Sequence, residues 1–329
     1  MASRIFGIDF GSDTVKIYRK GAGLIYFQKT MLALKNRKNV IAIGNDAYDI
    51  YGKAPDKIET EFPVREGVIA SIEKMQNLVN CIFLDLSKEY GKLRNAIFYV
   101  SVSADLTDIE KKAFFDIVDR SFIHPKSVKL IDKPLADGIG ADIDYDFTPG
   151  TLLVNIGAAT TEISVISTGT IVTSRLFRTG GYAVDEAIIG SVRKDYNILI
   201  GPKTAEMCKR KAVSLDETER DCKAYGRDVI TGLPKECVVR SGGLRPIIIE
   251  QINPLIEAIK SVLERTPPEV SAEIYKNGMV ITGGTAKISG ISDLIEDGTG
   301  LKVEIAEDPA ETVIRGLGKI MEGRYRLEQ

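Results

Sequence analysis

The chain has 329 residues, enough for two domains with separate cores, and its net charge of −2 gives no general electrostatic reason to expect nucleic-acid binding. Its composition, 44% apolar and 27% charged, is that of an ordinary globular protein, and no apolar run approaches the roughly 20 residues of a membrane-spanning helix. The only histidine, His124, precedes a proline in a predicted loop, which argues against histidine-based catalysis. The four cysteines lack CxxC spacing and are typical of reduced thiols in a cytoplasmic protein.

The first half of the chain predicts a hairpin followed by alternating helices and strands. Alternation of apolar and polar residues indicates strands, and apolar residues three and four apart indicate helices. Residues 53–66 are charged and hold two prolines, so we expect a surface excursion there. The predicted elements of this half are a hairpin at 5–18, strands at 23–29, 95–103 and 127–132, and helices at 68–86, 106–121 (capped near Thr107) and 134–143 (with Pro134 in its first turn).

The segment DYDFTPG (144–150) is the best candidate for a domain boundary, and the pattern then begins again. Both halves start with a hairpin and continue as helices and strands, which predicts a duplicated α/β unit. The predicted elements of the second half are strands at 151–157, 160–168 and 169–177, helices at 183–196 and 204–214, a polar strand region at 216–240, a long helix at 244–266, a strand at 278–284 and a last helix at 309–322.

The two hairpins carry the most informative motif. Residues 5–18 read IFGIDFGSDTVKIY and residues 152–166 read LLVNIGAATTEISVI, each a strand, a turn of small residues and a second strand. The turns, at 9–12 and 155–158, leave backbone N–H groups open to an anion. Two copies suggest two hairpins that grip one phosphate chain, with Asp9 able to hold the water shell of Mg²⁺. Taken alone, each turn is also compatible with an ordinary hairpin closed by a side-chain hydrogen bond.

Two further segments have features of a nucleoside site. The run MVITGGTAKISGI (279–291) predicts a strand, a Gly-Gly turn and a helix start, whose N-terminus can receive a base, a ribose or a phosphate. In TAEMCKR (204–210), Glu206 and Lys209 fall on one face of a helix. A Gly-Gly turn after a strand is common, and this spacing also suits a surface salt bridge, so neither segment identifies a site alone.

Together these segments resemble the rod-shape-determining bacterial actins, the MreB family. The similarity runs through SRLFRTGGYAVDEAI, YNILIGPKTAE, GRDVITGLPKE, LERTPPEVSAEI and VITGGTAKISGI, and includes GIDFGSDTVKIY and REGVIASIEKM near the start. It covers nearly the whole chain, and the TPPE and GRDxxTGLP strings are quite specific. The resemblance implies an actin-like ATPase fold of class α/β, with two lobes built on duplicated RNase-H-like cores, ATP and Mg²⁺ in the cleft between them, and head-to-tail filaments at the inner membrane.

The resemblance also implies a division into lobes and a set of site residues. Lobe I would span 1–148 with a small insert at about 30–70, and lobe II 149–329 with an insert at about 180–245 and a last helix packed back on lobe I. Asp9 would be the metal ligand. The implied contacts are Asp9, Gly11, Ser12 and Asp13 in the first phosphate turn, Asn155, Gly157, Ala158, Ala159 and Thr160 in the second, and Glu206, Lys209, Gly283 and Gly284 around adenosine.

The chain departs from the family pattern where the chemistry is expected. The family string DIGGGTTE is NIGAATTE here, so Asn155 replaces a metal-facing aspartate and two glycines are alanines. The string EEPMAAAIG is DKPLADGIG, so Lys133 stands where the family has the carboxylate that orients the attacking water. A GGG string ends here in Thr285, and the proline of CVPSGIT is Ser103 in SVSADLT.

These replacements change the expected electrostatics of the cleft. Glu to Lys adds two positive charges and Asp to Asn adds one, so the cleft is about three units more positive. Phosphoryl transfer depends on Mg²⁺ and on a carboxylate that orders the water. A protonated Lys133 cannot act as that base, although it could bind the β- or γ-phosphate as a point charge. The alternative is that Lys133 faces solvent or pairs with Asp132 or Asp137, with Asp132 taking over the catalytic task.

The sequence therefore predicts a nucleotide-binding, MreB-like filament protein involved in cell shape, which binds ATP or ADP with weakened use of Mg²⁺ and weak or lost hydrolysis. Two alternatives stay open: an active Mg²⁺-dependent ATPase that drives dynamic filaments, and a non-polymerising adaptor on the same fold. The expected partner is another copy of the chain, with no nucleic acid. The candidate membrane loop, 87–95, is polar with a single Leu93, so its basic residues predict at most weak, salt-sensitive contact with the inner membrane.

Overall fold

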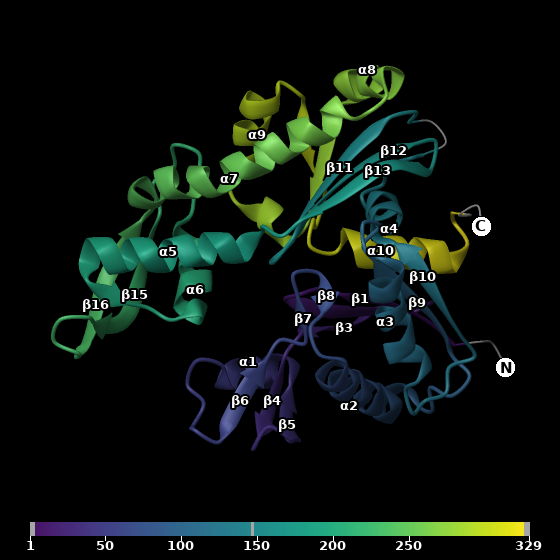
Figure 1. Cartoon of the computed structure of the whole chain (residues 1–329), viewed down its shortest axis with the longest axis horizontal. Helices are drawn as coiled ribbons and strands as arrows, with labels where there is room; N and C mark the ends of the chain where they lie inside the picture. Colours follow the sequence, from purple (N-terminus) through teal and green to yellow (C-terminus); the bar gives the residue numbers. More distant parts are fainter. Residues whose placement is uncertain (1–3, 146–147, 326–329) are drawn as a thin grey trace.

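The chain folds into two lobes, each built around a five-stranded sheet (Figure 1). The computed structural model describes residues 4–145 and 148–325, so residues 146–147 of the predicted boundary at 144–150 lie outside the described residues. In Figure 1 the first lobe, in purple and blue, fills the lower half, and the second lobe, in teal and green, fills the upper half. The last helix, in yellow, lies between the two.

The sheet of the first lobe grows from the predicted N-terminal hairpin. Its first three strands form an antiparallel meander, and its last two run parallel to the first strand. Helices α2 (Ile72–Tyr90) and α3 (Asp108–Asp119) cover one face, where Phe6, Ile8 and Phe98 are fully buried. The strands lie in the order β10 (Ser127–Asp132), β9 (Ile97–Val102), β1 (Ile5–Phe10), β2 (Thr14–Arg19) and β3 (Gly23–Lys29).

The sheet of the second lobe repeats the same topology. Again three antiparallel strands are followed by two that run parallel to the first, which confirms the predicted duplication. Because a strand-turn-strand hairpin begins each lobe, both turns emerge at the same place relative to their sheets. The strands lie in the order β13 (Thr170–Phe177), β12 (Thr161–Ser167), β11 (Thr151–Ile156), β17 (Met279–Thr282) and β18 (Val303–Ile305).

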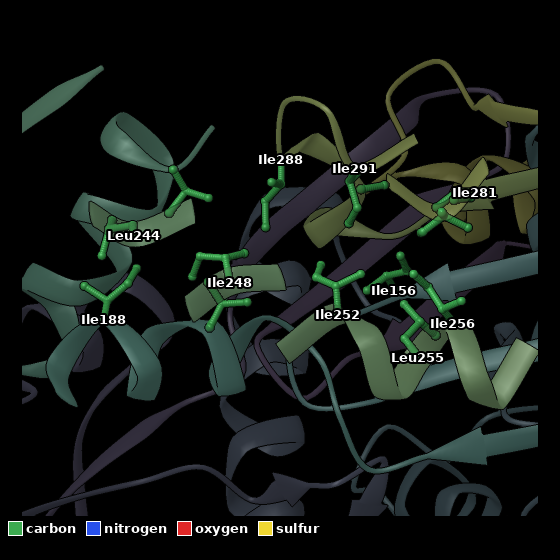
Figure 2. Close-up of a cluster of buried hydrophobic side chains, with 14 of the residues drawn as sticks. Ile156, Ile188, Leu244, Ile248, Ile252, Leu255, Ile256, Ile281, Ile288 and Ile291 are labelled. Carbon is green, nitrogen blue, oxygen red and sulfur yellow. The ribbon is translucent and has the colours of Figure 1, made fainter. Parts of the chain in front are cut away.

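Helix packing completes the core of the second lobe. The covering elements are α7 (Ser241–Glu264), α8 (Pro268–Asn277), α9 (Ile291–Thr299) and the 3-10 turn η1 (Gly284–Lys287). Figure 2 shows Ile248, Ile252 and Ile256 on successive turns of α7, with Ile156 and Ile281 of the sheet beside the last of them. Burial of one such side chain contributes about 1.5–3 kcal/mol, so this stripe anchors the long helix.

Each lobe also carries a smaller insert. The insert of the first lobe includes a three-stranded sheet and one helix: β4 (Leu32–Lys35), β5 (Asn39–Ile43), α1 (Gly44–Ile50) and β6 (Ile58–Glu61). A short ribbon follows it, β7 (Val64–Arg65) and β8 (Val68–Ile69). The insert of the second lobe comprises α5 (Gly181–Tyr196), β14 (Ile198–Leu199), α6 (Pro202–Ala212), β15 (Asp221–Asp228) and β16 (Pro234–Arg240). The segment predicted as a surface excursion, 53–66, is mostly exposed or half-buried, and it also contains β6, which pairs with β4 along its whole length.

Two helices lie between the lobes and touch backbone to backbone (Figure 1). They are α4 (Lys133–Gly140) and α10 (Thr312–Glu322). A Cβ on Gly140 would lie 1.7 Å from the carbonyl oxygen of Thr312, and one on Gly316 would lie 1.6 Å from that of Ala136. Only glycine fits at such distances. Leu317 of α10 packs with the first lobe, whereas Ile139 of α4 packs with the second.

Several element boundaries differ from the prediction. Helix α2 starts and ends four residues later than the predicted 68–86, because Ser71 caps its first turn and Gly91, with a φ of 75°, ends it. The cap predicted near Thr107 is confirmed, since this residue and Glu110 form a capping box. Helices α8 and α9 and strand β18 were not predicted as elements, and the helix start expected after the Gly-Gly turn is a 3-10 turn.

The predicted membrane loop contains no exposed apolar residue. Leu93 is 1% exposed and belongs to the core of the first lobe. Lys88 is paired with Asp85 at 2.9 Å on the surface of α2. Among the residues that the structure describes, no helix has the length and apolar character needed to cross a bilayer.

Candidate functional site

A cavity of about 760 Å³ opens between the two lobes, within the size range of small-ligand sites. Its walls come from both hairpin turns, from helix α6 and from the Gly-Gly turn after β17. Of the residues singled out from the sequence, those that line it are Asp9, Gly11, Ser12, Asp13, Ser103, Lys133, Asn155, Gly157, Ala158, Ala159, Thr160, Glu206, Lys209, Gly283, Gly284 and Thr285. Asp132 is not among the lining residues.

The two hairpin turns have the same backbone geometry. The N–H of Gly11 donates to the carbonyl of Thr14 at 3.0 Å, and that of Gly157 donates to Thr160 at 2.8 Å. A Cβ at either glycine would lie within 2.9 Å of the same carbonyl oxygen, so both positions require glycine. The glycine amides therefore close the turns and are not free for a ligand, in contrast to the simplest interpretation of the sequence.

The residues after each glycine have N–H groups without a partner among the residues that the structure describes. In the described part of the chain, the N–H groups of Ser12 and Asp13 in the first turn, and of Ala158 and Ala159 in the second, donate no hydrogen bond. All four residues line the cavity. Unpaired N–H groups grouped in two turns form an anion-binding concavity of the kind that receives a phosphate chain.

Neighbouring segments hold the second turn in place. Thr285, which ends the GGT string, donates from Oγ1 to the carbonyl of Gly157 at 2.8 Å. Gly181 donates its N–H to the same carbonyl at 3.0 Å. Gly283 has a φ of 86°, and a Cβ there would lie 2.2 Å from the carbonyl oxygen of Ile156, so the chain passes directly beside the end of β11. The second turn is thus fixed from two sides by glycine-rich backbone.

Asp9 lies at the head of the first turn, between two lysines. It is 5% exposed, and its Oδ1 accepts from Ser101 at 2.8 Å. Lys133 approaches the same oxygen at 3.5 Å, and Lys16 approaches Oδ2 at 3.5 Å. Burial alone would raise the pKa of Asp9, but the two ammonium groups outweigh it and hold the pKa below its usual value.

Lys133 points into the cleft, toward lobe I. Burial acts to lower its pKa, but Asp9, Glu162 and Asp137 outweigh that effect, so its pKa is raised and the ammonium stays protonated. Its ion-pair partner is Asp9, neither of the two aspartates considered from the sequence. Asp132 instead pairs with Lys111 at 3.3 Å, with its side chain 40% exposed. The structure does not bring the Asp132 carboxylate into the cavity.

Asn155 and Glu162, from the second hairpin, are both held by neighbouring side chains. The amide of Asn155 donates to Asp137 Oδ2 at 2.8 Å. Glu162 is 4% exposed, and one of its oxygens accepts from Ser103 Oγ at 2.7 Å and from the N–H of Ala104 at 2.9 Å. Burial raises the pKa of Glu162 even though Lys133 opposes that effect. This carboxylate therefore links lobe II to the loop that precedes α3 in lobe I.

One wall of the cavity carries an ion pair between the lobes. Lys29 of β3 reaches Glu206 of α6 at 3.0 Å and Asp13 at 2.8 Å. Tyr48 of α1 donates to the Glu206 carboxylate. Lys209 binds Asp185 at 2.7 Å, so the surface pair of Glu206 and Lys209 considered from the sequence does not form among the described contacts. Both insert regions thus meet at Glu206.

Sequence reasoning missed several residues that shape the site. Lys16 faces Asp9 directly in the hairpin register, and this pairing could have been found by counting outward from the turn. Lys29 and Asp185 carried no local signal, because their partners lie in other segments, and Asp137 was considered only as a partner of Lys133, not of Asn155.

Two lobes of one repeated topology, which enclose a cavity between two matching glycine turns, define an actin-like fold. In agreement, the solved structure titled "MamK double helical filament" matches with a TM-score of 0.79 at 18% identity, covering 97% of this chain and 99% of that one; at this identity the match supports the fold alone. The family model "MreB/Mbl protein" matches residues 3–329, and the chain belongs to this family.

Relatives within the family are similar over their whole length. The cell shape-determining protein Mbl of Bacillus subtilis is 33% identical over 330 residues, which covers 99% of this chain and 98% of the relative. MreB 5 of Spiroplasma citri, solved with AMPPNP, is 32% identical with a TM-score of 0.92, covering 98% of this chain and 97% of that one. The same protein has also been solved with ADP, at the same TM-score.

Proposed function

We propose that this chain binds ATP or ADP in the interlobe cavity, assembles into filaments with a role in cell shape, and hydrolyses ATP weakly or not at all. The observation that carries the proposal is the position of Asp9 between Lys16 and Lys133. Nucleotide binding is further supported by the amides of the two turns, whose residues line the cavity, and by the nucleotides bound to the similar MreB 5.

The charges around Asp9 favour a polyphosphate over a metal ion. Two ammonium groups and one carboxylate leave a local charge of about +1, which attracts a phosphate chain. A bound Mg²⁺ would neutralise negative charge on the phosphates. At Asp9, however, a divalent cation would be repelled by two lysine ammonium groups, each 3.5 Å from the carboxylate. The residues present therefore do not fit a tight Mg²⁺ site, and Lys133 instead supplies positive charge to the phosphates.

The acidic side chains of the cavity are already committed to partners. Among the described residues they are Asp9, Asp13, Glu162, Asp185 and Glu206, and each forms an ion pair or accepts hydrogen bonds. A base that orients the attacking water must be a group that can accept a proton and lies within hydrogen-bond distance of that water. With Lys133 protonated and Asp132 bonded to Lys111 outside the cavity, no such base is supplied by α4.

Self-assembly is proposed because the chain belongs to the MreB/Mbl family, whose members named above include a cell shape-determining protein. A contact between opposite ends of two copies would be heterologous and would continue as a filament. Sedimentation and electron microscopy with ADP, ATP and no nucleotide test this part. Monomers under every condition would favour the non-polymerising adaptor. A cytoplasmic location with weak membrane contact completes the proposal.

The chemistry is tested by ADP and ATP titrations with MgCl₂ or with EDTA, beside a phosphate-release assay. We expect wild-type affinities with and without metal to agree within about threefold, which is under 1 kcal/mol. Lys133→Ala should weaken ADP binding by roughly 5- to 150-fold, the equivalent of a charge-assisted hydrogen bond. Lys111→Ala, which removes a lysine outside the cavity, is the matched control and should leave the affinity unchanged. Wild-type turnover typical of an ATPase and abolished by EDTA would refute the proposal.

A further inference from the structure

Asp137 is a buried carboxylate directly behind the second phosphate turn. It is 0% exposed and lies on α4, one helical turn after Lys133, without being among the residues that line the cavity. Its Oδ2 accepts from the Asn155 amide at 2.8 Å and from Thr282 Oγ1 at 2.5 Å, and its Oδ1 accepts from Thr312. One side chain therefore joins α4, β11, β17 and α10.

The partners of Asp137 determine which way the Asn155 side chain faces. The Asn155 NH₂ group donates to Asp137 Oδ2 at 2.8 Å, so the nitrogen of the amide is turned toward the carboxyl group. The amide oxygen then takes the other direction, about 4.0 Å from where a Cβ on Gly157 would be. Asn155 itself lines the cavity. The buried carboxylate thus orders an uncharged side chain at the edge of the phosphate turn.

The same contact disfavours an ionised carboxylate at position 155. An aspartate there would hold an oxygen near the present amide nitrogen, 2.8 Å from Asp137 Oδ2. Two carboxylates at that distance cannot both be ionised, so one would have to bind a proton. Burial already raises the pKa of Asp137, although Thr282, Thr312, Asn155 and Lys133 oppose that effect. Asn155 and Asp137 therefore form a matched pair.

We propose that Asp137 is a positioning residue: it favours an amide at position 155 and orients it, ties the second phosphate turn to the helix pair α4–α10, and keeps a carboxylate that could bind a metal ion out of this side of the cavity. The coupling between Asp137 and Asn155 is inferred from their hydrogen bond and burial. Its consequence for ligand binding rests on the proposed function, namely that a nucleotide occupies the cavity.

An exchange of the two side chains tests the pair. The variants are Asn155→Asp, Asp137→Asn and both together; the double variant keeps the net charge and one amide–carboxylate hydrogen bond but moves the carboxylate to the cavity side. Without nucleotide, we expect Asn155→Asp to unfold about 5 °C or more below wild type, because it creates a buried carboxylate pair. The double variant should recover most of this loss. Additive shifts, with no recovery, would overturn the pairing.

Metal dependence separates a positioning role from a purely structural one. With ADP as the probe, wild-type affinity should differ less than about threefold between MgCl₂ and EDTA, whereas the double variant should bind at least about tenfold more tightly with MgCl₂, because its carboxylate faces the cavity. Recovery of stability without any gain in metal dependence would leave Asp137 a structural residue and refute the positioning role. If wild type binds no ADP, the proposed function fails, while the thermal comparison still tests the pair.

Discussion

Replacement of Gly316 by alanine should force apart the two helices that lie between the lobes. The new Cβ would lie 1.6 Å from the carbonyl oxygen of Ala136, whereas side-chain Cβ atoms essentially never approach closer than 3.0 Å. The backbones must therefore separate by about 1.4 Å, the difference between these distances. Because the obstructing atom belongs to the main chain of α4, no change of rotamer can relieve the contact.

Two opposing effects determine how much Gly316→Ala lowers the free energy of unfolding. Overpacking costs about 1–3 kcal/mol, here near the upper end, and the helix propensity of alanine returns about 1 kcal/mol. We therefore expect the free energy of unfolding to fall by about 2 kcal/mol and Tm by about 4 °C or more. Gly190→Ala is the matched control, since this glycine of α5 is exposed with nothing within 4 Å of its missing Cβ. It should raise stability by up to about 1 kcal/mol.

Calorimetry and denaturant titration of both variants measure the difference. Because α4 begins with Lys133, Gly316→Ala should also weaken ADP binding, whereas Gly190→Ala should not. A Gly316→Ala protein as stable as Gly190→Ala would show that α4 and α10 do not pack at this distance.

The remaining predictions concern a helix cap, an ionisable group and the polar loop. Thr107→Ala should cost about 0.5–2 kcal/mol in denaturant titrations by removing the capping box with Glu110; no loss would mean that the cap does not form. Burial raises the pKa of Asp185 to about 6 despite Lys209, so the stability that this group contributes is present at low pH and is lost as the pH rises from about 4 to 6. Asp185→Asn should flatten the plot of unfolding free energy against pH in that range, and an unchanged slope would contradict the shift in pKa. Since the loop 87–95 exposes no apolar residue, cosedimentation with anionic vesicles should be weak and disappear at high salt.

The parts of the fold that the sequence predicts well are those decided by local patterns. Each hairpin shows its first strand as an apolar run, its second by alternation and its turn by small residues, so the repeat of the sheet topology follows. The insert strand β6 was missed because its charged, proline-flanked sequence forms a strand only by pairing with β4. The range predicted for helix α2 started too early, because the apolar residues Val68 and Ile69 look like part of the helix in the sequence but belong to the two-stranded ribbon.

The residues of the site also fall into those that local sequence identifies and those that it does not. The turns and the substituted positions could be identified from residue type and spacing, but their partners could not. Lys133 pairs with Asp9, which lies more than 120 residues earlier in the chain, and Asn155 is held by Asp137 from the other side of the boundary. The first pair depends on the order of strands in the sheet of the first lobe, and the second on how the two lobes meet, so only the tertiary structure contains that information.

The two alanines of the second turn have a consequence for how such a protein can diverge. Gly157, where a Cβ would collide with Thr160, is retained, whereas Ala158 and Ala159 occupy positions without positive φ, where a Cβ is tolerated. The turn therefore keeps its shape through one residue and leaves its neighbours free to change. The shape of the turn and the side chains at its tip are therefore separable, so one backbone framework is compatible with different chemistry at positions 158 and 159.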